Sequence, residues 1–188
     1  MGKRRVIAIG TSTGGPKALN DVIPRLPKGL PAPIVIVQHM PAGFTKALAE
    51  RLDSVSQISV REAVAGDMLQ EGVALVAPGN FHMTVERGGR ISLNQEAPVH
   101  NVRPAVDVLM KSMVDVFGAD ILGVVLTGMG SDGAEGAAAI KRAGGRVIAQ
   151  DEATSVVYGM PRTVVDAGSA DIVAPITRVA EEIVRFLH

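Results

Sequence analysis

The segment VIAIGTSTGGP, from Val6 to Pro16, constrains the fold of this chain more than any other. Its apolar half predicts a buried strand, and its glycine-rich half predicts a tight turn into a helix. Gly10, Ser12 and Gly14 have the spacing of a nucleophile turn, in which small flanking residues let the backbone bend sharply and expose the serine oxygen above a sheet. Ser12 is therefore a candidate nucleophile of an α/β enzyme.

The same segment has two other interpretations. Ser12 or Thr13 can serve only to cap the helix that follows, with Pro16 in its first turn. Backbone N–H groups at a glycine-rich helix start can also bind phosphate. The spacing argues against a Walker A loop, because Lys17 comes one place late and Ala18 stands where the magnesium-binding hydroxyl belongs. From these residues alone, nucleophile and cap both remain open.

Composition excludes several classes of function. The 188 residues include no cysteine, which excludes disulfides, thiolate metal sites and a cysteine nucleophile. Basic and acidic residues balance at 19 each, so the composition shows no excess of positive charge that would indicate nucleic-acid binding. The apolar runs have the length of strands, too short for membrane insertion, and no segment resembles a signal peptide. We expect a cytoplasmic protein, and nothing indicates a cofactor or a metal ion.

The order of apolar and amphipathic segments predicts the fold class. Strand-like runs alternate with helical patterns, so we expect an α/β protein with a doubly wound, mostly parallel sheet and helices on both faces. A single domain over residues 1–188 fits this length. The expected strands are 6–9, 34–37, 121–126 and 147–149, and the expected helices are 17–26, 44–52, 104–117, 133–143, 161–167 and 177–187.

Residues 72–93 depart from this alternation. Gly72, Gly79, Gly88 and Gly89 separate short apolar runs from one another. We expect short antiparallel strands with tight turns over these residues, forming a small hairpin added to the domain.

Two further strand ends carry groups with catalytic potential. His39 follows the run 34–37, and Asp132 lies in the glycine turn after the run 121–126. Sites of open α/β proteins form at the edge where the carboxyl ends of parallel strands meet. Together with Ser12, these residues offer a nucleophile, a general base and an anion that orients the imidazole. Their chain order, Ser–His–Asp, differs from that of the α/β-hydrolases.

Both residues also have structural interpretations. His39 can bond only to local backbone, and Asp132 can be the N-cap of the helix that follows it. The segment Gly128–Gly133 also spells Gly-x-Gly-x-x-Gly, which supports the alternative of a nucleotide-binding α/β protein. That alternative leaves Ser12 and His39 without a role, and an aspartate in the turn repels a pyrophosphate. No pair of histidines has the spacing of metal ligands.

Six blocks of sequence follow one another in the order seen in a known family. They are IGTSTGG at 9–15, QHMPAGFT at 38–45, APG at 77–79 with His82-Met83 after it, RPAVDVL at 103–109, LTGMGSDGAEG at 126–136 and AQDEATSVVYGMP at 149–161. Together they resemble the catalytic domain of the CheB-type protein-glutamate methylesterases of bacterial chemotaxis, over nearly the whole chain.

The resemblance implies a reaction and roles for the site residues. The reaction is demethylation of glutamate γ-methyl esters in the cytoplasmic helical region of chemoreceptors, through an acyl-enzyme and with release of methanol. Deamidation of receptor glutamines is a second activity that the family suggests. Ser12 would be the nucleophile, His39 the base and acid, and Asp132 the orienting carboxylate. The backbone N–H groups of Thr13 and Met129 are candidates for the oxyanion hole.

The chain departs from the family pattern at its start. Family members usually carry an N-terminal receiver domain, whereas Ser12 is the twelfth residue of this sequence. We therefore expect a catalytic domain without a tethered receiver, either excised or stand-alone, with a separate receiver protein as one route of regulation. A domain that binds receptors without catalysis is a further hypothesis.

The rim of the expected cleft has four candidates: Arg103, Asp107, Asp151 and Glu152. Their alternative roles are charges at helix starts and on the surface. They are accordingly not counted among the catalytic residues.

Overall fold

A computed structural model describes residues 4–188 of the protein. The strands are β1 (Val6–Thr11), β2 (Ile34–Gln38), β3 (Ser59–Glu62), β4 (Val73–Val76), β5 (His82–Glu86), β6 (Arg90–Asn94), β7 (Ile121–Val125), β8 (Arg146–Gln150) and β9 (Ile172–Ala174). The α-helices are α1 (Gly15–Val22), α2 (Phe44–Val55), α3 (Val106–Phe117), α4 (Ala134–Arg142), α5 (Met160–Asp166) and α6 (Ile176–Leu187), and short 3₁₀ turns follow α1 and α3.

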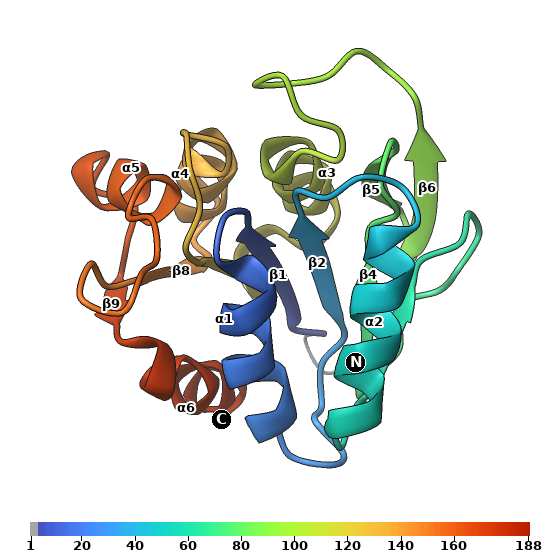
Figure 1. Ribbon diagram of the computed structural model, residues 1–188, viewed down its shortest axis with the longest axis horizontal. Helices are drawn as coiled ribbons and strands as arrows, with labels where there is room; N and C mark the ends of the chain where they lie inside the picture. Colours follow the sequence, from blue (N-terminus) through green and yellow to red (C-terminus); the bar gives the residue numbers. More distant parts are fainter. Residues whose placement is uncertain (1–3) are drawn as a thin grey trace.

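The main sheet has seven parallel strands in the order β3-β4-β2-β1-β7-β8-β9. The chain starts in the middle at β1, builds one half through β2, β3 and β4, and then returns to the other side of β1 as β7. The strand order therefore reverses at β1 (Figure 1). Loops after the central strands diverge at such a switch point, which is where open α/β sheets form their sites.

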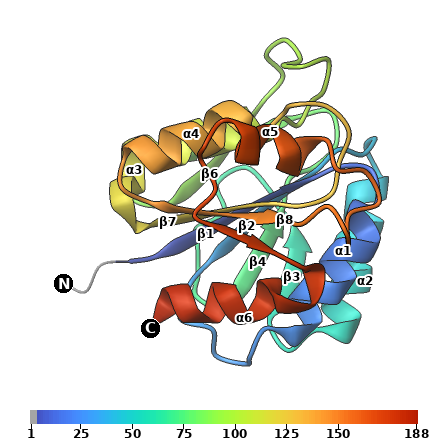
Figure 2. The same ribbon diagram turned by 90° about the vertical axis from the view of Figure 1, so that its left-hand side faces the viewer.

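Helices cover both faces of the sheet, as Figure 2 shows. Helices α1, α2 and α6 pack on one face against alternate residues such as Ile7 and Ile9 of β1. Helices α3, α4 and α5 pack on the other face, against Val6 and Ala8. Because β1 is buried on both faces, its sequence is apolar without interruption. The predicted doubly wound α/β fold is confirmed.

Two glycines let helices approach their neighbours closely on the α3 face. A Cβ atom at Gly10 would lie 2.4 Å from Val106 Cγ1, so the first turn of α3 packs directly on β1. A Cβ atom at Gly136 would lie 2.7 Å from Met110 Cβ, so α3 and α4 pack closely as well. These contacts bring the N-terminal turns of α3 and α4 to the carboxyl end of β1.

The structure corrects the prediction for residues 72–80. The hairpin of β5 and β6 exists and is antiparallel, with His82 opposite Asn94. However, β4 is a parallel strand of the main sheet, between β3 and β2. Its sequence Val-Ala-Leu-Val has side chains in the core on both faces of the sheet, so it shows no polar–apolar alternation that would indicate its partner strand.

Strands β3 and β9 were not predicted. β3 is an edge strand of four residues in which Val60 alone is buried, and β9 has only three residues. Neither is long or apolar enough to stand out in the sequence. No helix among residues 4–188 has the length and apolar character needed to cross a membrane.

Candidate active site

The carboxyl ends of β1, β2 and β7 open into one cleft of about 350 Å³. Ser12 follows β1, His39 follows β2, and Asp132 lies in the turn between β7 and α4. All three line the cleft, together with Thr13 and Met129. The five residues that the sequence singled out thus lie together, because their strands are neighbours in the sheet.

The backbone of Ser12 is tied to the neighbouring strand ends. Its N–H donates to the Thr127 carbonyl at 3.0 Å, and its carbonyl accepts from Gln38 Nε2 at 2.8 Å. A Cβ atom at Gly128 would lie 2.9 Å from Ser12 Cβ, so only a glycine there lets the two loops pack this closely. These contacts fix the position from which the Ser12 hydroxyl faces the cleft.

The helix after Ser12 begins without a side-chain cap. Its N-cap is Gly14, whose φ of 81° lies in the left-handed region, and no side chain accepts from the first turn. Ser12 and Thr13 therefore do not cap α1, and the capping interpretation is wrong. The positive end of the α1 dipole points toward the turn that carries Ser12.

Buried polar residues at the strand ends fix these turns, and the sequence interpretation missed them. Thr11 Oγ1 donates to the Thr127 carbonyl at 2.7 Å, and Thr127 Oγ1 donates to the Thr13 carbonyl at 2.9 Å. Gln150 Oε1 accepts from the Thr127 N–H at 2.8 Å. A signal did exist, because the apolar runs of β1, β2, β7 and β8 are each followed by a polar residue, and all four are buried: Thr11, Gln38, Thr127 and Gln150.

His39 and Asp132 form a close pair. His39 Nε2 lies 2.7 Å from Asp132 Oδ2, and the Asp132 side chain is only 2% exposed. The same carboxylate accepts from the backbone N–H of Val106 at 2.7 Å and from that of Asp107 at 2.9 Å. Burial by itself raises the pKa of the Asp132 carboxyl, but the bonds from His39 and the two N–H groups outweigh it, so the net pKa lies below its ordinary 3.8.

Asp132 caps a different helix from the one expected. The N-cap of α4 is Gly133, which has no side chain to cap with, and the Asp132 carboxylate instead binds the first two N–H groups of α3. The prediction that Asp132 caps the helix after it is thus wrong. The residue does have a capping role, and this role is compatible with its contact to His39.

His39 uses Nε2 for the carboxylate, which leaves Nδ1 for a proton from another group. Between residues 4 and 188, no hydrogen bond joins the Ser12 hydroxyl to the His39 ring, although both line the same cleft. Contacts of this kind are often long in unliganded sites and tighten when substrate binds. Local backbone bonding is not the main contact of this ring, since its partner is a side chain 93 residues away.

A second His–Asp pair lies beside the first. His100 Nε2 is 2.7 Å from Asp107 Oδ2, and the Asp107 side chain is 1% exposed. Asp107 Oδ1 accepts from the N–H of Gly133 at 3.0 Å and from that of Gly136 at 2.7 Å. Burial raises the pKa of the Asp107 carboxyl above its ordinary value, in spite of these bonds.

The Asp107 contacts bear directly on the nucleotide-binding alternative. A pyrophosphate in the Gly128–Gly133 turn would need free N–H groups at the start of α4. The N–H groups of Gly133 and Gly136 are already bound to the carboxylate of Asp107. The alternative therefore receives no support from the structure.

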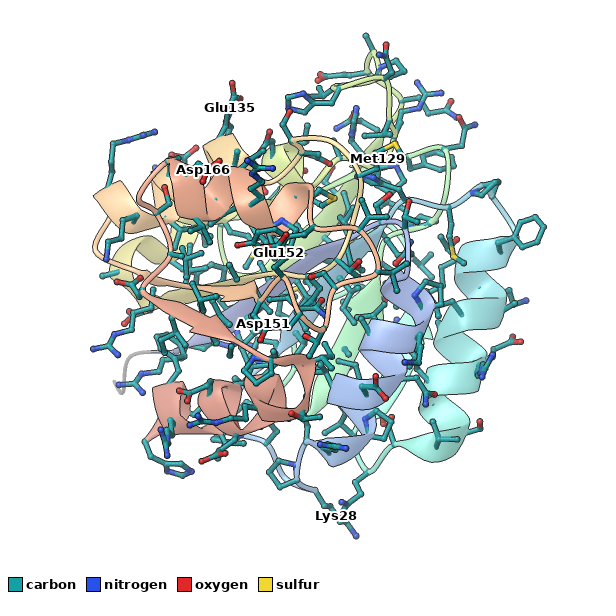
Figure 3. All side chains as sticks on the ribbon, turned by 60° about the vertical axis from the view of Figure 1, so that its left-hand side comes forward. Lys28, Met129, Glu135, Asp151, Glu152 and Asp166 are labelled. Carbon is teal, nitrogen blue, oxygen red and sulfur yellow. The ribbon has the colours of Figure 1, made fainter. Side chains whose placement is uncertain are left out.

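None of the four rim candidates lines the cleft. Arg103 donates to carbonyls of the long segment between β6 and α3, which extends past the strand ends in Figure 1. Asp151 binds Thr154 within its own turn, and Glu152 is exposed (Figure 3). The cleft lining instead includes His100 and Val102.

Three side chains near the cleft have the chemistry of metal ligands. His100, Asp107 and Glu135 have donor atoms within 4.8 Å of one another. His100 and Asp107 bind each other, while Glu135 points toward solvent (Figure 3) and pairs with Lys111 at 2.5 Å. A metal ion would have to displace both pairs, so the arrangement offers no specific argument for one.

The fold and the cleft together define a class of protein. The chain is a doubly wound α/β protein with a hydroxyl, an imidazole and a carboxylate at three adjacent strand ends, the set of groups that serine hydrolases use. Comparison with known families narrows this class. The sequence model described as CheB methylesterase matches residues 7–183, and the chain belongs to this family.

Relatives and solved structures agree with this assignment. A protein of Symbiobacterium thermophilum named protein-glutamate methylesterase/protein-glutamine glutaminase is 57% identical over 97% of this chain and 50% of its own length. One of the same name from Pyrococcus abyssi is 50% identical, with the same coverage. The chain thus spans about half the length of these relatives. The crystal structure of the Thermotoga maritima CheB methylesterase catalytic domain superimposes with a TM-score of 0.94 at 45% identity, covering 97% of this chain and 98% of that one.

Proposed function

We propose that residues 1–188 form the catalytic domain of a protein-glutamate methylesterase. Its substrate is a glutamate γ-methyl ester in the cytoplasmic region of a chemoreceptor, and it acts in the cytoplasm without a cofactor. The observation that carries the proposal is the joint placement of Ser12, His39 and Asp132 in one cleft, with the imidazole 2.7 Å from a buried carboxylate. The names of the relatives supply the substrate class.

The reaction begins at Ser12. Its Oγ attacks the carbonyl carbon of the methyl ester, and His39 Nδ1 takes the hydroxyl proton as the new C–O bond forms. The tetrahedral intermediate then collapses, the bond to the methoxy oxygen breaks, and His39 returns the proton to that oxygen. Methanol leaves, and the glutamyl group remains as an ester on Ser12. A water activated by His39 hydrolyses this ester and releases free glutamate.

Asp132 keeps His39 in the productive orientation. Its carboxylate holds the ring through Nε2, which leaves Nδ1 unprotonated before the attack, and it stabilises the imidazolium that forms afterwards. The backbone N–H groups of Val106 and Asp107 hold the carboxylate itself. Because these contacts lower the pKa of Asp132, the carboxyl is ionised throughout the neutral pH range.

Two backbone N–H groups at the cleft suit the negative oxygen of the intermediate. Thr13 and Met129 lie in the turns after β1 and β7, and both line the cleft with Ser12. Within the described part of the chain, neither N–H has a hydrogen-bond acceptor. Each such donor contributes about 3 kcal/mol of transition-state stabilisation when it is aimed at the oxyanion. The N-terminus of α1 adds a favourable dipole on the same side.

The accessibility of the cleft fits a protein substrate. Met129 is 68% exposed at the cleft and offers an apolar surface to a segment that carries the ester. The same steps with a glutamine side chain would release ammonia in place of methanol, so deamidation belongs to the same proposal. A receiver on a separate protein is one way in which access to this cleft could be controlled.

Methanol release from a carboxyl-methylated chemoreceptor cytoplasmic fragment tests the proposal. We expect release by the wild-type protein and none above background by Ser12→Ala. Ser131→Ala is the matched control, because Ser131 lines the same cleft and its hydroxyl has no assigned role. Receptor binding without methanol release from the wild type would instead support a domain that binds without catalysis.

A further inference from the structure

The two buried aspartates at the cleft cap each other's helices. Asp132 lies just before α4, yet its carboxylate binds the N–H groups of Val106 and Asp107 at the start of α3. Asp107 lies in the first turn of α3, yet its carboxylate binds the N–H groups of Gly133 and Gly136 at the start of α4. The segment at the start of each helix therefore supplies the acceptor for the N-terminus of the other helix.

We infer that Asp107 is a positioning residue for the hydrolysis, which fixes the carboxylate of Asp132 by anchoring the residue next to it in the chain. The anchor is the 3.0 Å bond from the Gly133 N–H to Asp107 Oδ1. Gly133 has a φ of 99°, a left-handed conformation that the turn after Asp132 needs in order to reverse into α4. This inference rests on the proposed function, since a positioning role has meaning only for a reaction in this cleft.

Close packing of α3 against α4 brings the Asp107 carboxylate within hydrogen-bond distance of the start of α4. Gly136 has no side chain between α4 and α3, and a Cβ there would lie 3.3 Å from Asp107 Oδ1 as well as 2.7 Å from Met110 Cβ. The carboxylate can therefore approach the Gly136 N–H to 2.7 Å. Any shift of Asp107 would be transmitted to the turn of Asp132, because the N–H groups of Gly133 and Gly136 share Asp107 Oδ1 as their acceptor.

The second oxygen of Asp107 is held from the cleft side. His100 Nε2 contacts Oδ2 at 2.7 Å, and His100 lines the cleft. Both oxygens of this buried carboxylate are thereby satisfied, one by the N–H groups at the start of α4 and one by His100. Asp107 thus connects the turn of Asp132 with a cleft-lining histidine, without lining the cleft itself.

The chemistry of the contact distinguishes two substitutions. An asparagine at position 107 keeps an oxygen for Gly133 and Gly136, and its amide N–H₂ can donate to the His100 ring. Because burial raises the pKa of Asp107, exchanging its charge for a neutral amide of the same shape removes a desolvation penalty. Alanine removes the acceptor altogether, and serine is too short to reach the same N–H groups.

The test compares Asp107→Ala, Asp107→Ser and Asp107→Asn in the full chain. We expect kcat for methanol release to fall roughly 10- to 100-fold in Asp107→Ala and Asp107→Ser, the loss typical of a displaced catalytic group, with KM within about threefold. Asp107→Asn should keep kcat within about threefold of the wild type. The control is Asp53→Ala, which removes a carboxylate bound to the Val60 N–H at 2.8 Å; Asp53 lies in the last turn of α2, does not line the cleft, and should leave kcat unchanged when replaced.

A second readout needs no substrate. Amide hydrogen exchange of Val106 reports on Asp132, because that N–H is buried and bound to Asp132 Oδ2. We expect its exchange to speed up at least 10-fold in Asp107→Ala and Asp107→Ser, while amides of β1 and β2 keep their protection. The serine variant keeps a polar group at the site and serves where the alanine variant does not fold.

The outcomes separate the two proposals. If the wild type releases no methanol, the proposed function fails, and the exchange of Val106 alone decides whether Asp107 fixes Asp132. The inference is overturned if folded Asp107→Ala or Asp107→Ser keeps the wild-type kcat and Val106 protection. It is also overturned if Asp107→Asn loses as much activity as they do, or if exchange rises equally throughout the protein.

Discussion

We expect removal of the Asp132 carboxylate to affect both catalysis and folding. The carboxylate contacts His39 Nε2, the bond proposed to orient the ring, and at the same time binds the N–H groups of Val106 and Asp107 at the start of α3. The variant Asp132→Ala therefore loses two functions at once. We expect kcat to fall about 10⁴-fold, the scale on which triad aspartates act in other serine hydrolases.

The loss of stability in Asp132→Ala can be calculated from the hydrogen bonds that the carboxylate makes. Replacing a capping aspartate with alanine costs about 1 kcal/mol, and a buried N–H left without an acceptor costs about 1–3 kcal/mol more. Val106 is 0% exposed, so water cannot replace the lost acceptor there. We expect the free energy of unfolding to fall by about 3 kcal/mol. For a protein of this size that corresponds to a decrease in Tm of roughly 6–12 °C.

Thermal unfolding and methanol release, measured on the same preparations, test the expected decreases in Tm and kcat of Asp132→Ala. Ser12→Ala should lose activity and keep its Tm, because the Ser12 hydroxyl makes no bond within the described residues. Asp53→Ala should lose only about 1 kcal/mol and keep its activity, since it gives up a single N–H contact. If Asp132→Ala melts no lower than Asp53→Ala, the capping role is refuted. If it retains wild-type kcat, the role in orienting His39 is refuted.

Three further changes have defined expectations. In Gly128→Ala the new methyl group would lie 2.3 Å from Met160 Sδ, so we expect a loss of about 1–3 kcal/mol in a denaturant titration and a lower kcat as the turn shifts. The pKa of Asp132 in the folded protein is below its ordinary value of 3.8, so its stabilising contribution is complete above about pH 4 and is lost as the pH falls through the lowered pKa. Below pH 4, the measured Tm should therefore fall more steeply with decreasing pH in the wild type than in Asp132→Ala. Thr11→Ala loses the 2.7 Å bond to the Thr127 carbonyl, so thermal unfolding should show a free energy of unfolding lower by about 1 kcal/mol, with kcat within about threefold of the wild type. A 100-fold loss of kcat would assign Thr11 a role in the reaction.

The central architecture was predictable from the sequence because the signals there are strong and local. The runs of β1, β2, β7 and β8 are apolar and bounded by glycine or polar residues, and the amphipathic segments between them are helices in the structure. The positions of Ser12, His39 and Asp132 followed from the same reasoning, since parallel strands end at one edge. Strand β4 was assigned to the wrong sheet because a short apolar run does not reveal its partner.

The contacts that complete the site could not be predicted in this way. Asp107 and Asp132 are 25 residues apart, and their exchange of helix caps depends on how closely α3 and α4 pack. Sequence spacing predicts a cap for the helix directly after an aspartate, which is why Asp132 was assigned to α4. Asp107 was a candidate for the cleft rim, with a charge at a helix start or on the surface as its alternative; it does lie in the first turn of α3, but it is buried, with 1% of its surface exposed.

The claim that Ser12 is a nucleophile activated by His39 can be tested directly by covalent labelling. The protein is treated with a fluorophosphonate, which reacts with serines activated by a neighbouring base, and the modified peptide is identified by mass spectrometry. We expect one phosphonate per molecule, located on Ser12, with labelling lost in His39→Ala and retained in Ser131→Ala. Labelling of Ser131, or equal labelling of the wild type and His39→Ala, would contradict it.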